Sequence, residues 1–225
     1  MSSAEATSTL VPMESKFRAS PLALAVLGLL EVGPLHPYGI QRLIKQWGKD
    51  RVVNVGNRAN LYKTIKRLHE AGLIAVLQTE RDQQYPERTV YELTEDGRTK
   101  SKEWLVGMLS TPRNEFPEFP AALSFAMLLG PEETVAVLER RAELLAEDVA
   151  TYEHDAETHS GSLPRVTLLD DEYQLAVATA ELNWIRGVIE DLRSGLLTWG
   201  DELANAARSS LAEAGVTREE LGVVQ

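Results

Sequence analysis

Apolar residues recur along the first half of the chain at the spacing of α-helices. Residues 22–30 are apolar on every side, which is typical of a buried helix, and Ser20 followed by Pro21 suits its N-terminal cap and first turn. A second helix is predicted at residues 37–46, after a Gly-Pro pair ends the first. Its apolar positions at helical spacing are Ile40, Leu43, Ile44 and Trp47. Both helices are expected to contribute to one core.

Residues 57–74, NRANLYKTIKRLHEAGLI, predict a third helix with a basic outer face. Leu61, Ile65 and Leu68 follow one another at spacings of four and three, so they share the buried face. Gly72 stands just past the last turn, where glycine commonly ends a helix. The first turn and the outer face carry amide and cationic side chains, namely Asn57, Arg58, Asn60, Lys63, Lys66 and Arg67.

Two β-rich segments, residues 73–79 and 89–93, flank a polar stretch that contains a proline. This pattern predicts a β-hairpin with a polar tip. Thr94 then suits the N-cap of another helix, with two acidic residues in its first turn and with Trp104 and Leu105 further along. Three helices followed by a two-stranded hairpin form the order of a winged helix-turn-helix.

The second half of the chain is predicted to be helical throughout. A stretch with three prolines precedes it and indicates a linker at residues 112–120. The expected helices are a short one at 121–129, a long amphipathic one at 132–158, another from Asp170 or Asp171 to about 197, and a shorter one followed by a frayed tail from Trp199.

Charge is distributed unevenly over the 225 residues, whose net charge is −11. Residues 16–104 contain 15 lysines and arginines against 10 acidic residues, a net charge of +5. Residues 105–225 contain 8 against 22, a net charge of −14. A basic half joined to an acidic half indicates one module that faces nucleic acid and one that stays off it. Chance clustering of charge is the alternative.

Composition indicates the cellular compartment in which the protein is expected. The chain has no cysteine, which removes disulfides and thiolate metal sites and fits a cytoplasmic protein. Its first residues lack the basic and apolar regions of a signal peptide. The longest apolar run, Leu22 to Leu30, is shorter than the about 20 residues that span a bilayer. Cytoplasmic localisation without a membrane partner is therefore expected.

Double-stranded DNA is the partner that these features predict. A major groove about 12 Å wide accepts one helix, whose Asn and Arg side chains reach base edges while Lys and Arg meet phosphates. The candidate contacts are Asn57, Arg58, Asn60, Tyr62, Lys63 and Lys66 from the third helix, with Gln84 and Arg88 from the wing. Two plainer interpretations stay open: a basic helix face that is merely solvated, and asparagines 57 and 60 that only cap the helix.

The two long C-terminal helices carry apolar stripes that the short helix is too small to cover. Burial of these stripes against a symmetry mate predicts a homodimer, and an intramolecular helical bundle is the alternative. The predicted fold class is mainly α, with an N-terminal winged helix-turn-helix of three to four helices plus a two-stranded wing and an all-helical C-terminal dimerisation domain. The predicted domains are a disordered tail at residues 1–15, a winged-helix DNA-binding domain at 16–110, a helical dimerisation domain at 111–200, and a C-terminal helix or tail at 201–225.

Three segments together resemble the PadR family of bacterial transcriptional regulators: residues 23–44, 59–74 and 88–98. The residues that fit the family's motifs are Gly33, Pro34, His36, Tyr38 and Ile40, then Leu61, Tyr62, Arg67, Leu68, Gly72 and Leu73, and finally Tyr91, Leu93, Thr94 and Gly97. The resemblance covers roughly residues 20–105, and the C-terminal helices resemble the longer, virulence-activator-like domain of the family.

The resemblance implies a homodimer that is mostly a repressor. A two-fold dimer is expected to read a palindromic operator, and occlusion of a promoter by the bound dimer is the expected mechanism. The resemblance also implies release from DNA by a small-molecule effector in some members. His36 is expected to have a structural or phosphate-contacting role. Residues 58–60 depart from the family's pattern where base contacts would be made, so the operator sequence does not follow from the resemblance.

No catalytic, metal or cofactor site is predicted. The chain has no Gly-rich phosphate loop and no H-E-x-x-H motif, and His154 and His159 are five residues apart, which points them to different helix faces. Several aromatic residues can line a ligand cavity or, alternatively, make core or dimer contacts: Phe116, Phe119, Phe125, Trp184 and Trp199. A protein-interaction module and a ligand sensor, each without direct DNA binding, are the rival functions.

Overall fold

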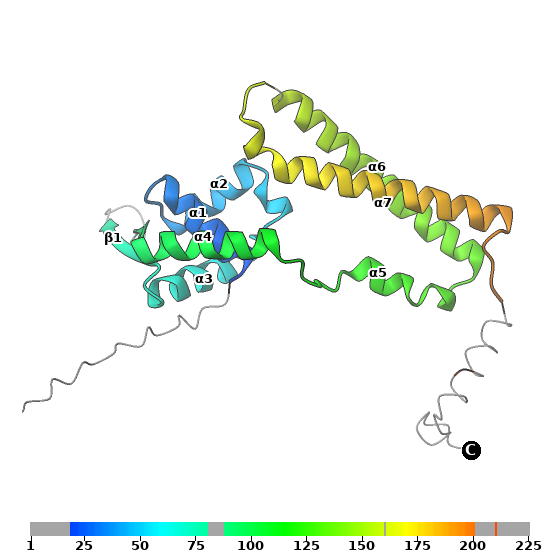
Figure 1. Ribbon diagram of the computed structural model, residues 1–225, viewed down its shortest axis with the longest axis horizontal. Helices are drawn as coiled ribbons and strands as arrows, with labels where there is room; N and C mark the ends of the chain where they lie inside the picture. The colour runs from blue at the N-terminus through cyan, green and yellow to red at the C-terminus, as the bar shows by residue number, and fades with distance from the viewer. Residues whose placement is uncertain (1–18, 81–87, 160, 201–209, 211–225) are drawn as a thin grey trace, which may run out of the picture. The chain divides into compact units, whose positions relative to one another are not determined.

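The computed structural model describes residues 19–80, 88–159, 161–200 and 210. The chain forms two compact units, Met1–Asn114 and Glu115–Gln225, called the N-terminal unit and the C-terminal unit below. The first combines helices with one small hairpin, and the described part of the second is built from helices (Figure 1). The predicted fold class, mainly helical with a two-stranded wing, is confirmed.

The N-terminal unit has the element order of a winged helix. Its elements are α1 (Pro21–Val32), α2 (Pro37–Gln46), the 3-10 turn η1 (Lys49–Arg51), α3 (Arg58–Glu70), β1 (Ile74–Glu80), β2 (Arg88–Leu93) and α4 (Glu95–Ser110). Each helix and strand expected from the apolar pattern of this half is present close to its predicted place. The helix α1 starts as expected, because the Ser20 Oγ accepts a hydrogen bond from the Ala23 N–H at 3.2 Å and Pro21 follows.

The core of this unit forms where α1 meets α2, α3 and the hairpin. Five of the apolar residues predicted to point inward are at most 2% exposed; they are Ile40, Ile44, Leu61, Ile65 and Leu68. Leu43 is partly buried against the same core, whereas the inward position predicted for Trp47 was wrong, because this residue follows the last turn of α2 and is 48% exposed. The buried residues of α1 that meet the five buried side chains are Leu22, Ala23, Val26, Leu27, Leu29 and Leu30. Burying one such large side chain contributes about 1.5–3 kcal/mol, so α3 is held firmly by one face while its other face stays in solvent.

The hairpin is extended by one further backbone segment. β1 and β2 pair in antiparallel fashion with Ile74 opposite Leu93, and the register shifts just after Val76, which marks a β-bulge. Leu35 forms an isolated bridge with Tyr91, with N–H to carbonyl distances of 3.0 and 2.9 Å in the two directions. Tyr91 packs against the core. The wing is thereby fixed to the segment between α1 and α2.

The junction between the hairpin and α4 is tightly packed. The Thr94 Oγ1 accepts from the Gly97 N–H at 3.0 Å and donates to the Gly72 carbonyl at 2.8 Å, so one hydroxyl caps α4 and ties it to the end of α3. A side chain at Gly97 would place its Cβ 1.9 Å from the Leu73 carbonyl oxygen. Glycine is therefore required here by close backbone approach.

The C-terminal unit contains α5 (Glu118–Leu123), the 3-10 turn η2 (Ala126–Leu128), α6 (Pro131–His159), the 3-10 turn η3 (Arg165–Thr167) and α7 (Leu169–Ser194). Both long helices were predicted. The single short helix expected at 121–129 was wrong, and the linker predicted at 112–120 ends earlier, at α5.

The structure explains both corrections. Pro120 falls in the first turn of α5, where its missing N–H is not needed, so this proline does not prevent a helix. The helix then ends early, because the Ser124 Oγ donates back to the Pro120 carbonyl at 3.1 Å and the Phe125 N–H bonds to the Ala122 carbonyl at 3.0 Å. That shorter bonding pattern continues as the 3-10 turn η2.

The two long helices lie side by side (Figure 1). The residues at the centre of their contact are buried, namely Leu138, Ile185, Ile189 and Leu192. An ion pair between Arg141 and Glu181, with an N–O distance of 2.5 Å, crosses the same interface. The central part of the apolar stripes from which a dimer was predicted is thus covered within the chain, as in the intramolecular alternative.

Two of the predicted segments fall outside the described residues. They are the tail at residues 1–15 and most of the segment after Trp199. Trp199 itself is anchored, because its Nε1 donates to the Leu129 carbonyl at 2.9 Å.

Candidate nucleic-acid interface

The first turn of α3 presents amide and cationic side chains to solvent. Asn57 is the N-cap, and its Oδ1 accepts from the Ala59 N–H at 3.0 Å. Arg58 and Asn60 are exposed in the turn that follows. The capping role considered for Asn57 is therefore real, yet its amide also carries an NH2 donor. A groove that received this end of α3 would meet three polar side chains at once.

The exposed face continues along α3 through Tyr62, Lys63 and Lys66. Tyr62 is 52% exposed although it follows a fully buried leucine. Among the residues that the structure describes, Arg58 and Lys63 form no ion pair. The Lys66 Nζ lies 3.7 Å from a carboxylate oxygen of Glu70, and both side chains are well exposed. Such a pair is worth only about 0.2–0.5 kcal/mol, so both lysines can turn toward a phosphate.

Of the two wing residues predicted to contact DNA, only Arg88 lies among the described residues. Arg88 begins β2 and stands opposite Glu80 in the register. Gln84 lies outside the described residues, as does the side chain of Arg88. Contacts from the wing therefore stay predictions.

A second polar stripe, not recognised from the sequence, runs along α2. Tyr38, Arg42 and Lys45 are spaced by four and three residues and are all exposed, with Tyr38 at 57%. The spacing of four and three residues could have predicted this stripe from the sequence. The apolar residues between its members instead led to a prediction of the buried face alone. In helix-turn-helix proteins the helix before the recognition helix crosses the DNA backbone, which this stripe would suit.

His36 has a structural role. Its Nδ1 accepts a hydrogen bond from the Gly39 N–H at 2.7 Å and so caps the start of α2. The imidazole also packs edge-on against Tyr38, with ring centroids 6.0 Å apart. The capping bond explains why a histidine suits this position without any catalytic function.

The described residues contain no group of three His, Asp or Glu side chains that could hold a metal ion. Within the same part of the chain, none of the helices combines the length and the apolar character needed to span a membrane.

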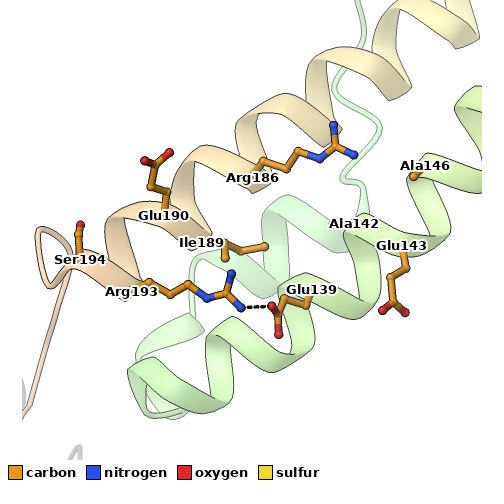
Figure 2. A pocket seen from close by; sticks show the side chains of 9 residues that line it. All are labelled: Glu139, Ala142, Glu143, Ala146, Arg186, Ile189, Glu190, Arg193 and Ser194. Carbon is orange, nitrogen blue, oxygen red and sulfur yellow. Dashed lines mark hydrogen bonds and ion pairs between the residues drawn. The ribbon is translucent and has the colours of Figure 1, made fainter.

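An open groove of about 880 Å³ lies between α6 and α7 in the C-terminal unit. Figure 2 shows Arg193 of α7 paired with Glu139 of α6, and Ile189 pointing from α7 toward α6. Arg186 also lines the groove, and it forms no ion pair with any residue that the structure describes. The remaining lining residues are Ala142, Glu143, Ala146, Glu190 and Ser194. Five of the nine lining residues are charged.

The aromatic residues considered as a ligand-cavity lining lie elsewhere. Phe119 packs against the C-terminal core with the Arg141 guanidinium 3.7 Å from its ring centroid, and Trp184 meets Phe119 edge-on at 6.3 Å. Trp199 also packs against this core. The other two aromatic side chains are largely exposed; they are Phe116 and Phe125. None of the five lines the groove, so the core-contact alternative holds for Phe119 and Trp199.

The fold is shared with known regulators. PadR from Bacillus subtilis, solved in complex with operator DNA, is 20% identical over 76% of this chain and 98% of that chain, with a TM-score of 0.65. The same protein in complex with p-coumaric acid is 18% identical over 78% of this chain and 99% of that chain, with a TM-score of 0.59. The Vibrio cholerae virulence activator AphA is 21% identical over 77% and 98%, with a TM-score of 0.56. At these identities the likeness establishes the fold.

A search of curated proteins found no match. A family model, that of the transcriptional regulator PadR-like family, does match residues 26–103. The matched range runs from the middle of α1 through the wing and into α4, so it covers the elements that form the winged helix. Residues 26–103 of this chain therefore form a domain of the PadR-like family of transcriptional regulators.

Proposed function

We propose that the protein is a sequence-specific DNA-binding regulator that places α3 in the major groove and acts as a homodimer on a palindromic operator. The observation that carries this proposal is the exposed first turn of α3, with Asn57, Arg58 and Asn60 standing on a helix whose opposite face is fully buried. Asn and Arg are suited to bidentate contacts with adenine and guanine edges. Occlusion of a promoter by the bound dimer makes it a repressor.

Each part of the interface has its own task in this proposal. Arg58 and Asn60 read bases, and Asn57 adds a contact through its amide nitrogen while its oxygen caps α3. Lys63 and Lys66 neutralise phosphates, and Tyr62 donates its hydroxyl to the backbone. Gln84 and Arg88 bring the wing to the neighbouring backbone, and residues 16–110 form the DNA-binding domain.

The dimer is proposed to form through a second apolar stripe on α7, within a dimerisation domain at residues 111–200. The stripe consists of Tyr173, Val177, Ala180 and Trp184, which recur at spacings of four and three. Tyr173, Val177 and Trp184 are 66%, 42% and 50% exposed. At 100° per residue the stripe points roughly 120° away from the buried face of α7, so α6 does not cover it. A self-complementary contact between two such stripes would form a two-fold dimer.

Substitution of Val177 by glutamate tests the dimer. A charge at the centre of a buried contact is costly to desolvate, so Val177→Glu is expected to sediment as a monomer while wild-type protein sediments as a dimer. Asn183→Glu is the matched control, since Asn183 is exposed on a different face of the same helix. A monomeric wild-type protein, or equal dimerisation of all three proteins, would contradict the proposed stripe.

Release by a small-molecule effector is the part of the proposal that concerns the groove in Figure 2. Arg186 offers hydrogen bonds to an acidic ligand, because Arg193 is already paired with Glu139. PadR from Bacillus subtilis has been solved with an organic acid, p-coumaric acid. A ligand shifts only states that it binds with different affinity, so the effector would have to bind the DNA-free arrangement more tightly. On addition of p-coumaric acid, wild-type protein is expected to lose DNA binding, whereas Arg186→Gln is expected to keep it.

Selection from a random pool of DNA duplexes tests the function itself. Wild-type protein is expected to enrich a palindromic sequence and to bind it at least about 10³-fold more tightly than a scrambled duplex. Affinity should fall steeply between 50 and 200 mM salt, because phosphate contacts release counterions. Failure to enrich any sequence at low salt would overturn the proposal.

A protein-interaction function is the second candidate, supported by an apolar face on the C-terminal half of α4. Leu105, Val106 and Leu109 are 45%, 65% and 79% exposed there. In this case the double substitution Lys63→Glu and Lys66→Glu would leave the binding of a partner protein and its salt dependence unchanged. The same double variant would abolish DNA binding under the main proposal.

A further inference from the structure

We propose that Gln41, a buried amide on α2, is a positioning residue that sets the location of the DNA-reading end of α3. The inference rests on the proposed DNA-binding function. It concerns a residue that contacts no base itself and acts through the loop between α2 and α3. Gln41 lies in the core-facing part of α2 and is 8% exposed.

The contact that carries the inference is a single hydrogen bond. The Gln41 Nε2 donates to the Val55 carbonyl at 3.1 Å, and the bond is buried. Val55 is 1% exposed and Val53 is 9% exposed, so the loop is inserted into the core at this point. A polar side chain as deeply buried as Gln41 nearly always has a hydrogen-bond partner, and here the partner is the Val55 carbonyl.

Two side-chain hydrogen bonds at the end of this loop are local. The Asn54 Oδ1 accepts from the Gly56 N–H at 3.2 Å, and the Asn57 Oδ1 accepts from the Ala59 N–H at 3.0 Å. Both bonds join residues two positions apart, so they define the shape of the turn but not its place in the unit. The bond from Gln41 spans 14 residues and joins the loop to a different helix.

Val55 is two residues before the cap of α3, so a displacement of its carbonyl is passed directly to Asn57 and Arg58. Hydrogen bonds to base edges weaken steeply when distance or angle departs from its optimum, whereas a lysine on a phosphate acts at longer range and tolerates movement. Loss of the Gln41 bond should therefore impair discrimination between sequences more than it impairs general DNA affinity.

The experiment compares Gln41→Met with Ile44→Val. Methionine keeps the length of the side chain but has no donor for the Val55 carbonyl. Ile44 lies one turn further along α2, is 2% exposed, and can lose a methylene without loss of the loop bond. The probes are the duplex that wild-type protein selects from a random pool and a scrambled duplex, each titrated at two salt concentrations with the folded fraction measured by circular dichroism.

Gln41→Met is expected to lose about tenfold in its preference for the selected over the scrambled duplex, the discrimination that one good base contact carries. Its salt slope should equal that of wild type. Ile44→Val is expected to unfold at a lower temperature with its preference unchanged. If Gln41→Met does not fold, Gln41→Asn gives the answer, since its amide falls about 1.5 Å short of the carbonyl and the same loss is expected.

Two results would overturn the inference while leaving DNA binding intact. One is wild-type preference in the Gln41 variants, and the other is an equal loss of preference in Ile44→Val. If wild-type protein itself prefers no duplex, the proposed function fails first and this inference fails with it.

Discussion

Neutralising the two lysines on the exposed face of α3 should change the salt dependence of DNA binding by a predictable amount. Lys63 and Lys66 are exposed, and the only described ion pair between them and an acidic residue is the weak one with Glu70. Substituting both by glutamine removes two cationic groups while keeping their polarity and helix propensity. The two-fold dimer would therefore lose four phosphate contacts.

Each phosphate contact contributes about 0.9 to the slope of log affinity against log salt concentration, so four contacts contribute about 3.6. Between 50 and 200 mM salt the wild-type affinity should thus fall about 150-fold further than that of the double variant. Fluorescence titration of a labelled duplex at four salt concentrations measures both slopes.

Lys100→Gln with Lys102→Gln is the matched control, since both residues lie on α4 in the same unit and the change in net charge is the same. The control should keep the wild-type slope. Equal slopes for all three proteins would refute the idea that α3 meets phosphates, and equal reductions in both double variants would show that only net charge matters.

The remaining predictions concern folding and the cap of α3. Gly97→Ala should cost at least about 2 kcal/mol of unfolding free energy in urea denaturation, because the new Cβ would lie 1.9 Å from the Leu73 carbonyl oxygen; wild-type stability would refute this. Asn57→Ser should keep the stability, since serine also caps helices, but should weaken operator binding by removing the amide donor; unchanged affinity would assign Asn57 a capping role alone. The hydrogen bond from Arg165 holds the pKa of Glu172 below its ordinary value, so its stabilising effect is present above the unfolded pKa and is lost as pH falls through the folded one. Glu172→Gln should thus lower the melting temperature at pH 7 and leave it unchanged in strong acid, and a difference that persists in acid would contradict the assignment.

Periodicity accounts for what the sequence predicted well. Leu61, Ile65 and Leu68 share one face at spacings of four and three, and all three are buried in α3. The polar side chains left on the other face are the exposed ones. The amphipathic pattern and the location of the candidate DNA-contacting face follow from the same geometry, which is why both could be predicted together.

Contacts distant in sequence account for what was missed. The hydrogen bond from Gln41 to Val55 joins a helix to a loop 14 residues away, and no spacing rule reports it. A local contact accounts for another error: the early end of α5 depends on the Ser124 hydroxyl, which donates to the Pro120 carbonyl four residues earlier. The buried stripes of α6 and α7 showed that a partner was needed, but periodicity is silent on whether the partner belongs to the same chain.

Footprinting of wild-type protein on its selected duplex, by hydroxyl radicals and by methylation interference at guanine N7, tests the placement of α3 most directly. The expected result is two equal protected windows whose centres are about 10–10.5 base pairs apart or a multiple of that, with interference at guanines on the major-groove side of each window. A single protected window, or protection without major-groove interference at low salt, would contradict a two-fold dimer that reads DNA with α3.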